Sequence, residues 1–391
     1  MQDKHRKSVS ALYTAIGRGH PNYLDSTLRM LRPLCREREI DLNITSVFTI
    51  SKFPALWGWN TIRKIYQTGP QNDILSNFYN KIRGRKSKIS DDNILLKILA
   101  RDMRQHFKNY EGLIVVAHPL LVQLLGASHR LIYIHGEIAA PQEFELAQAE
   151  RIYVPLQETA RRMITAGVAS TKIETTGLML EPELEKKRDL IINSRHKRIA
   201  DGSKPVIGCF NSGAYPRLHV ENILKLITHV QKRKLGRIIL SAGNDITKFE
   251  YFKNNLADFK PCFCIREFLK SQFDLLIVHD QDRENLTLRE IETLEHIDLL
   301  VMAAHERVNW SVGLHLPAIL LTPHYGNFAL QNHEFTIANA LVYDNPDIGH
   351  AVESFLTDFR NQDAKLTLQR EVFDTKGASN TAHSIINILE N

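Results

Sequence analysis

The chain has 391 residues, of which 43% are hydrophobic and 24% are charged, a balance typical of a folded protein with two or three domains. This composition excludes a disordered chain, a collagen and a disulfide-stabilised mini-protein, and no apolar run reaches the roughly 18 residues of a membrane span. Four cysteines are too few for a disulfide framework. Together with an N-terminus that lacks an apolar signal core, they predict reduced thiols and a cytoplasmic protein.

The charge is unevenly distributed along the chain. Residues 1–110 contain 20 Lys and Arg against 9 Asp and Glu, whereas the remaining residues contain 30 against 35. A basic first part favours an anionic partner, such as a phosphate group, a nucleic acid or an acidic membrane surface. A solvated charged face explains the excess equally well.

Short apolar runs rich in β-branched residues alternate with longer amphipathic segments in the first half of the chain. The strands predicted there are Val9–Ile16, Ile44–Ile50, Gly112–Ala117, Leu131–His135, Ile152–Pro155 and Ile173–Thr176. The predicted helices include Tyr23–Arg38, Ile94–Lys108 and Gln157–Ala166.

The second half repeats the alternation. Its predicted strands are Pro205–Phe210, Arg237–Ser241, Phe273–His279, Asp298–Ala303, Pro317–Thr322 and Leu341–Tyr343. Its predicted helices are Val220–Lys232, Ile246–Leu256, Leu288–Leu294, Phe328–Asn339 and Ile348–Phe359. Strands that alternate with helices indicate βαβ units and parallel sheets, here in two successive runs.

A polar, charge-rich stretch, Glu181–Lys204, separates the two runs and has the composition of a domain connection. We therefore expect an α/β protein with two Rossmann-like domains, 1–180 and 205–391, joined by a linker at 181–204. Their sheets are expected to face each other across a cleft. Whether the last helix packs on the first or the second domain is left open by the sequence. Because ligands of open α/β sheets bind at the carboxyl ends of the strands, the functional residues are expected in the loops that follow them.

The first such loop is Gly17-Arg18-Gly19-His20, between a predicted strand and a predicted helix. Glycines there let backbone N–H groups approach an anion or a sugar oxygen. His20 is a candidate general base for a bound hydroxyl, although a surface or capping histidine has the same pattern.

The predicted loops of the second half are rich in small and polar residues. Asn211-Ser212-Gly213-Ala214 suits a close approach to phosphate, although a plain tight turn looks the same. The later loops provide groups that hydrogen-bond the hydroxyls of a sugar. The remaining donor-binding candidates are Gly243, His305, His324, Gly326, Asn327 and Gln331.

An aromatic segment, residues 53–59, contains Phe53, Trp57 and Trp59 and precedes a basic run. The basic residues are Arg63, Lys64, Lys81, Arg83, Arg85, Lys86 and Lys88. Indoles and cations together favour an anionic membrane surface, but they are also found in nucleic-acid-binding proteins. The purely structural alternative is that the tryptophans belong to the core and the basic run is a surface loop.

Two further patterns are weak. Asp280-Gln281-Asp282 has the spacing of an acidic metal-binding pair, but such triplets are common in loops. His118, after the strand at 112–117, fits a catalytic role and a loop-capping role equally well. No metal site is predicted.

These loops together resemble a group of GT-B glycosyltransferases: the monogalactosyldiacylglycerol synthases, the processive diacylglycerol glucosyltransferases and the N-acetylglucosaminyltransferase of peptidoglycan lipid intermediates. The resemblance runs from about Val9 to the last helix. Its most specific part is 153–160, Tyr-Val-Pro-Leu-Gln-Glu-Thr-Ala, which continues to Thr176-Gly177-Leu178. Ser212-Gly213-Ala214 is similar to the family's glycine-rich loop near the donor diphosphate.

The resemblance implies transfer of a hexose from a sugar nucleotide, usually UDP-linked, to a lipid hydroxyl at the inner face of the cell membrane. It implies no cofactor, no essential bound metal and no nucleic acid, with the acceptor on the first domain and the nucleotide on the second. His20 would be the catalytic base. The acceptor-binding residues would be Gly17, Gly19, Trp57, Trp59, His118, His135 and Glu137.

The chain departs from the family at the donor loop. Where the family has a glutamate that holds the ribose hydroxyls, this chain has Trp310, and the family's glycines are replaced by Ala304 and Glu306. Two other functions therefore stay open. One is a sugar-nucleotide 2-epimerase, for which Glu137, Asp280 and Asp282 are the acidic candidates; the other is a non-catalytic protein that binds sugar nucleotides or lipids.

Overall fold

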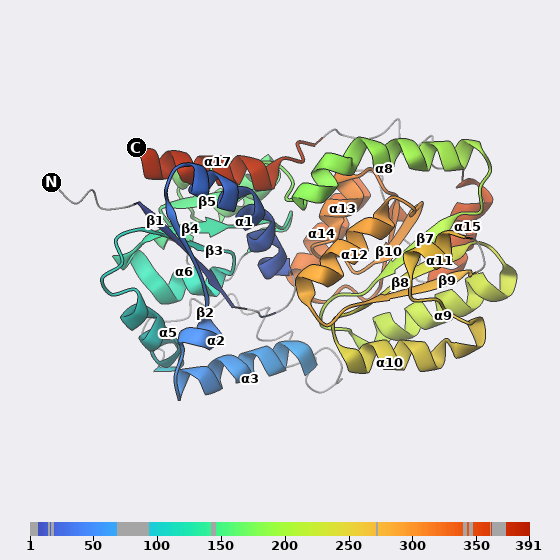
Figure 1. The fold of residues 1–391 in the computed structure, drawn as a ribbon, viewed down its shortest axis with the longest axis horizontal. Helices are drawn as coiled ribbons and strands as arrows, with labels where there is room; N and C mark the ends of the chain where they lie inside the picture. The colour runs from blue at the N-terminus through green and yellow to red at the C-terminus, as the bar shows by residue number, and fades with distance from the viewer. Residues whose placement is uncertain are drawn as a thin grey trace. The chain divides into compact units, whose positions relative to one another are not determined.

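The computed structural model describes residues 7–14, 16, 19–68, 94–141, 146–270, 273–338, 342–343, 347–359, 361 and 373–391. The chain forms two compact units (Figure 1). Unit 1 comprises Met1–Pro182, Gly326–Phe328 and Phe373–Asn391, and unit 2 comprises Glu183–Tyr325 and Ala329–Val372.

Within its described residues, unit 1 contains a parallel sheet in the strand order β2-β1-β3-β4-β5-β6. The strands are β1 (Ser8–Tyr13), β2 (Asp41–Ser46), β3 (Leu113–Val116), β4 (Arg130–Ile134), β5 (Arg151–Val154) and β6 (Ile173–Thr175). All four side chains of β3 are 0% exposed. A strand that is covered on both faces reads as an unbroken apolar run, which is why these strands are visible in the sequence.

Helices cover both faces of this sheet. They are α1 (Gly19–Glu37), α2 (Val47–Ile50), α3 (Ala55–Thr68), α5 (Ile94–His106), α6 (Pro119–Leu125), α7 (Gln157–Thr165) and α17 (Gly377–Glu390). Apolar side chains of α1 and α17 share one core cluster with β1 and β3, and the two helices lie side by side in Figure 1. Side chains of α5, α6 and α7 form the core on the opposite face.

Unit 2 contains, among its described residues, a parallel sheet in the order β12-β11-β10-β7-β8-β9. The strands are β7 (Val206–Phe210), β8 (Arg237–Gly243), β9 (Leu275–His279), β10 (Leu299–Met302), β11 (Ala318–Leu320) and β12 (Val342–Tyr343). The helices are α8 (Pro182–Ala200), α9 (Arg217–Arg233), α10 (Ile246–Asn255), α11 (Ile265–Leu269), α12 (Arg283–Leu294), α13 (Val308–Gly313), α14 (Gly326–Ala338) and α15 (Ile348–Thr357).

Two predicted segments differ from the structure. The strand expected at Ile44–Ile50 lies earlier, as β2, because its residues pair with β1 from Asp41 to Ser46. The Ser46 side chain then accepts a hydrogen bond from the backbone N–H of Phe48, 3.2 Å away, and so caps α2. The stretch expected as a linker, Glu181–Lys204, is mostly the 19-residue helix α8, and nearly all of it belongs to unit 2.

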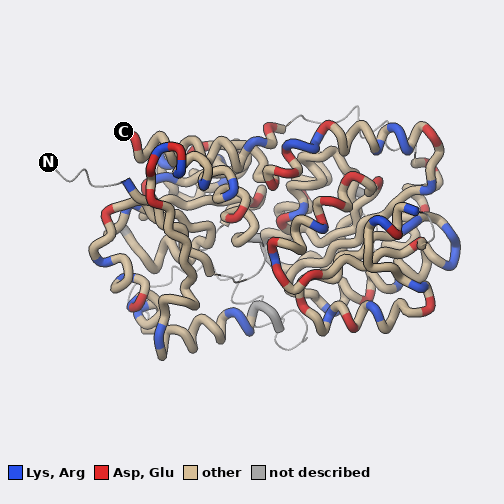
Figure 2. Tube along the Cα trace, in the orientation of Figure 1, with Lys and Arg blue, Asp and Glu red and all other residues tan. Residues whose placement is uncertain are grey.

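The strands carry few charged residues and the helices carry most of them (Figure 2). This is the distribution expected when both faces of a parallel sheet are covered. Among the described helices, none has the length and hydropathy needed to cross a bilayer.

The strand orders define where each sheet is expected to bind a ligand. In unit 1 the chain moves to β2 on one side of β1 and to β3 on the other; in unit 2 it moves to β8 on one side of β7 and later to β10 on the other. At such a switch point the loops after the two neighbouring strands diverge, which leaves a crevice at the carboxyl edge.

Candidate functional site

The switch point of unit 2 is a small polar pocket at the ends of β7 and β10. It is lined by Phe210, Asn211, Ser212, Ala303, His305, Glu306 and Arg307. Three predicted donor-binding residues, Asn211, Ser212 and His305, therefore lie in one pocket although they are separated by more than 90 positions in the sequence.

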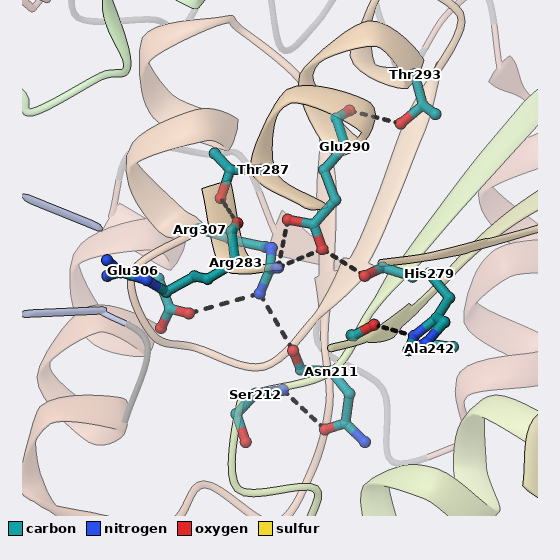
Figure 3. Close-up of polar contacts among 12 residues, drawn as sticks. Asn211, Ser212, Ala242, His279, Arg283, Thr287, Glu290, Thr293, Glu306 and Arg307 are labelled. Atoms are coloured by element: carbon teal, nitrogen blue, oxygen red, sulfur yellow. Dashed lines mark hydrogen bonds and ion pairs between the residues drawn. The ribbon is translucent and has the colours of Figure 1, made fainter. Parts of the chain in front are cut away.

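Arg307 forms the centre of this pocket, between Glu290 and the loop after β7 (Figure 3). Its Nη2 donates to both carboxylate oxygens of Glu290, at 2.8 and 2.9 Å, and its Nη1 donates to the carbonyl of Asn211 at 3.2 Å. Glu290 also accepts a hydrogen bond from the Ser241 hydroxyl. Arg307 is 5% exposed and Glu290 1%, so this is a buried ion pair. Glu306 lies 3.5 Å from Nη1.

Aromatic rings complete the surroundings of Arg307. The guanidinium carbon lies 5.1 Å from the ring centroids of both Phe210 and Trp310. The two rings meet edge to face at 5.7 Å. Trp310, which stands at the family's ribose-binding position, is buried in α13 and is not among the residues that line the pocket.

Several donor atoms of the pocket are unused. The side-chain oxygen of Asn211 accepts a hydrogen bond from the backbone N–H of Ser212 at 2.8 Å, so this oxygen points toward the main chain of the loop. Within the described part of the chain, Nδ2 of Asn211, Oγ of Ser212 and Nε of Arg307 have no hydrogen-bond partner, although all three atoms are buried. Buried donors without an acceptor cost free energy, so such a group of atoms indicates a ligand that supplies acceptors.

The sequence reasoning missed Arg307, Glu290 and Ser241. A signal for Glu290 was present, because it stands four residues from both Leu286 and Leu294 on one face of α12 and is therefore on the buried side. A carboxylate at such a position needs a cationic partner. Nothing in the sequence indicates which arginine provides it.

The other predicted donor residues are less closely grouped. Gly213 and Ala214 continue the loop after β7 and are not among the residues that line the pocket. A Cβ atom at Gly243 would lie 1.6 Å from the Tyr215 hydroxyl oxygen, and Gly243 has φ +74°, so this glycine is required by packing. The His324 ring lies 4.1 Å from that of His333.

Three more donor candidates lie on α14. Gln331 is 8% exposed. Gly326 and Asn327 begin α14, and their side-chain surroundings lie outside the described part of the structure.

The switch point of unit 1 brings two predicted histidines together. His20, in the first turn of α1, and His118, after β3, line one pocket with Thr14 and Tyr13. Their ring centroids are 4.7 Å apart with an interplanar angle of 58°. His118 also caps α6, because its Nδ1 accepts from the backbone N–H of Leu120 at 3.2 Å. His118 therefore has the capping role that the sequence allowed, and it also lines this pocket.

His135 and Glu137 follow β4 and are buried. Nε2 of His135 donates to the carbonyl of Ala139 at 2.6 Å, and Nδ1 accepts from the Tyr133 hydroxyl at 2.9 Å. Burial lowers the pKa of His135 to about 4. Both ring nitrogens are therefore engaged within the protein, and the ring is neutral at physiological pH.

We expect His135 to make the stability of the protein depend on pH. The folded side chain stays neutral down to about pH 4, whereas an unfolded histidine binds a proton below roughly pH 6.5. Unfolding therefore takes up a proton between these values, and the free energy of unfolding falls as the pH falls, by about 1.4 kcal/mol per pH unit for each such group.

The measurement is urea unfolding of the wild type and of the His135→Gln variant between pH 4.5 and 7. His219, whose pKa is also lowered to about 4 by burial, contributes the same dependence in both proteins. The variant should therefore show a shallower slope than the wild type. Equal slopes would contradict this account of His135.

The remaining acceptor candidates separate into surface and core. Trp57 is 63% exposed, whereas Trp59 is 0% exposed and belongs to the core against α5 and α6. The expectation that both tryptophans contact an acceptor is therefore wrong for Trp59, because its ring packs inside unit 1. Gly19 is the first residue of α1, and Gly17 lies outside the described residues.

The acidic pair after β9 has local structural roles. Asp282 caps α12 by accepting from the backbone N–H of Asn285 at 2.8 Å, and Asp280 accepts from the N–H of Asp282 at 3.0 Å. Within the ranges that the structure describes, no group of three or more His, Cys, Asp and Glu side chains is placed to hold a metal ion.

Searches for sequence relatives found no matching family model and no matching curated protein. Solved structures do match over nearly the whole chain. The MnaA–UDP co-structure from S. aureus has a TM-score of 0.58 at 10% identity and covers 98% of this chain and 96% of that one. UDP-GlcNAc 2-epimerase from Neisseria meningitidis, bound to UDP-GlcNAc, has a TM-score of 0.58 at 12% identity, with 98% and 100% covered.

A putative UDP-N-acetylglucosamine 2-epimerase from Listeria monocytogenes matches with a TM-score of 0.59 at 11% identity, covering 98% of this chain and 96% of that one. Similarity over the full length of both chains, with two parallel α/β sheets, decides the fold. The chain has the GT-B fold. The two parallel sheets are those predicted from the alternating strands and helices. In a GT-B fold the two switch points described above are the places where ligands are expected.

Proposed function

We propose that the protein is a nucleotide-sugar enzyme that transfers a hexose from a UDP-sugar to the hydroxyl of a lipid acceptor. The observation that carries the proposal is the set of unused buried donors on Asn211, Ser212 and Arg307 at the switch point of unit 2. Phosphate and sugar oxygens are the acceptors that such donors bind. The full-length similarity to enzymes in complex with UDP and UDP-GlcNAc supports the same ligand class.

Both Glu290 and Glu306 pair with Arg307, so the pocket offers hydrogen bonds and carries no net positive charge. Oriented donors that are already in place when the reaction begins stabilise the negative charge that develops on a departing diphosphate. The small pocket of unit 2 is therefore assigned to the phosphate or sugar oxygens of the donor and not to the whole nucleotide, with Asn211 and Ser212 as the hydrogen-bond donors.

The pocket of unit 1 is assigned to the acceptor hydroxyl. His20 accepts the hydroxyl proton while the oxygen forms a bond to the anomeric carbon, and the bond from that carbon to the diphosphate oxygen breaks. His118, 4.7 Å from His20 between ring centroids, is held by its hydrogen bond to Leu120 and limits how the His20 ring is oriented. A general base of this kind contributes about 10²–10⁴-fold to a rate.

Exposed aromatic residues beside cations support a lipid acceptor at the inner face of the cell membrane. Phe53 is 80% exposed and Trp57 63%. Of the basic residues that follow this segment, Lys64 lies on α3 and is exposed. Aromatic rings and cations suit the headgroup region of an anionic membrane. The basic residues Lys81, Arg83, Arg85, Lys86 and Lys88 lie outside the described residues.

A second candidate is a sugar-nucleotide 2-epimerase in the cytoplasm, because the similar solved structures include UDP-GlcNAc 2-epimerases. That reaction removes and returns a proton at C2 of the sugar, which requires an acid–base group. Glu137, a buried carboxylate after β4, is the candidate within unit 1.

The test is incubation of the full chain with UDP-hexoses, with and without vesicles that contain diacylglycerol, followed by analysis of the sugar products. Transfer predicts release of UDP that requires the lipid, together with a glycosylated lipid. Epimerisation predicts a C2 epimer of the donor without lipid. Binding of UDP-sugar with neither product would leave a non-catalytic binding protein and would overturn the transferase proposal.

A further inference from the structure

A separate cavity of unit 1 lies between α5, α6 and a 3₁₀ turn at Leu146–Gln148. Its volume is about 220 Å³. It is lined by Leu96, Lys97, Arg104, Gln123, Leu124 and Gln148, none of which belongs to the pocket of His20 and His118.

The lining includes two cationic side chains, Lys97 and Arg104, and no carboxylate. Lys97 and Arg104 are seven residues apart on α5, which places them two turns apart on one face of the helix. Nε of Arg104 donates to the Leu124 carbonyl at 2.8 Å, and Arg104 forms no ion pair within the described part of the chain. The pKa of His129 is lowered by burial and by the positive charge of Arg104.

Two polar groups of the cavity, those of Arg104 and Gln148, converge over Gly126. A Cβ atom at that position would lie 3.5 Å from Oε1 of Gln148 and 4.0 Å from Nη2 of Arg104. The glycine, with φ +70°, therefore leaves room where these groups meet. Oε1 of Gln148 is buried and has no hydrogen-bond partner among the described residues.

A ligand that fits must accept hydrogen bonds from the guanidinium and donate one to Gln148. We propose that this cavity binds a phosphate group that keeps a proton or carries a neighbouring hydroxyl, such as hydrogen phosphate or a phosphate monoester. The cavity is smaller than the roughly 300 Å³ at which pockets for whole organic ligands begin, so it suits a phosphate-sized group. It also gives a role to part of the excess positive charge of residues 1–110. The site is independent of the donor pocket and of the reaction proposed above.

The test is calorimetric titration of the full chain with inorganic phosphate at constant ionic strength. The variants are Arg104→Gln and, as the matched control on the same helix, Arg101→Gln. Arg101 is exposed, pairs with Asp102 at 2.9 Å and does not line the cavity. Loss of a charged hydrogen bond should weaken phosphate binding by Arg104→Gln by about tenfold or more, whereas Arg101→Gln should bind as the wild type does.

A second arm identifies the source of the phosphate, using phosphatidylcholine vesicles with and without phosphatidic acid. Binding of free phosphate that depends on Arg104 supports a soluble ligand. Binding only to vesicles with phosphatidic acid, again dependent on Arg104 and not on Arg101, supports a lipid headgroup. The proposal is overturned if neither probe binds, or if both variants lose binding equally, because the effect would then be one of general surface charge.

Discussion

The Glu290→Ala variant is expected to lose about 3 kcal/mol of stability, because the buried guanidinium of Arg307 loses the carboxylate that accepts both hydrogen bonds of its Nη2 and keeps only Glu306, 3.5 Å from Nη1, as a counter-charge. Arg307 is 5% exposed, and its Nη2 donates to both carboxylate oxygens of Glu290. The contacts with the rings of Phe210 and Trp310 are too weak to replace a carboxylate. The exposed Glu292, on the same helix, provides the matched control: Glu292→Ala should change stability by less than about 0.5 kcal/mol.

The measurement is urea unfolding followed by the fluorescence of Trp310, in a Trp57→Phe/Trp59→Phe background so that the signal comes from unit 2 alone. The double variant Glu290→Leu/Arg307→Met separates charge from packing, since replacing a buried ion pair by apolar side chains is often neutral. It should recover most of the lost stability. If it is as unstable as Glu290→Ala, the loss has its origin in packing and the account of the pair is wrong.

The His20→Ala variant is expected to lose turnover by about 10²–10⁴-fold while its melting temperature stays close to that of the wild type. The loss follows from the removal of the base that accepts the acceptor's proton. His20 is partly exposed and lies in the first turn of α1, so its ring contributes little to the core. The reaction is followed as release of nucleoside diphosphate.

Two further variants make the test of His20 specific. His106→Ala, at an exposed position at the end of α5, should keep full activity. His118→Asn retains an acceptor for the backbone N–H of Leu120, so it should fold normally, and it should lower turnover less than His20→Ala. Turnover of His20→Ala within twofold of the wild type would remove His20 from the catalytic role.

The sequence predicted the fold well because both sheets are parallel and covered on both faces. Apolar runs such as residues 113–116 then mark strands regardless of their neighbours. The prediction failed where burial is partial. The edge strand β2 has no fully buried residue, so its bounds depend on pairing with β1, which composition does not show. α8 was expected as a linker because its sequence is rich in charged residues and shows little of the apolar periodicity typical of a helix.

The positions of the candidate residues were predicted in part. Loops that follow adjacent parallel strands meet at one edge of the sheet, and this brought Asn211 together with His305, and His20 together with His118. The partner of Glu290 could not be predicted, because a buried ion pair between α12 and the loop after β10 depends on three-dimensional packing. That only one of Trp57 and Trp59 is exposed could have been predicted from the sequence, because residues two apart on a helix face nearly opposite directions.

The central claim is that the switch point of unit 2 binds a nucleoside diphosphate sugar, and it is tested most directly by the melting temperature of the full chain with UDP-, GDP-, ADP-, CMP- and dTDP-sugars. A ligand at 100 times its Kd stabilises the folded state by about 2.7 kcal/mol, which corresponds to a rise of several degrees. We expect this rise with the UDP-sugar, and we expect it to be lost in the Ser212→Val variant. No rise with any of the five ligands, or an equal rise in Ser212→Val, would contradict the assignment of this pocket.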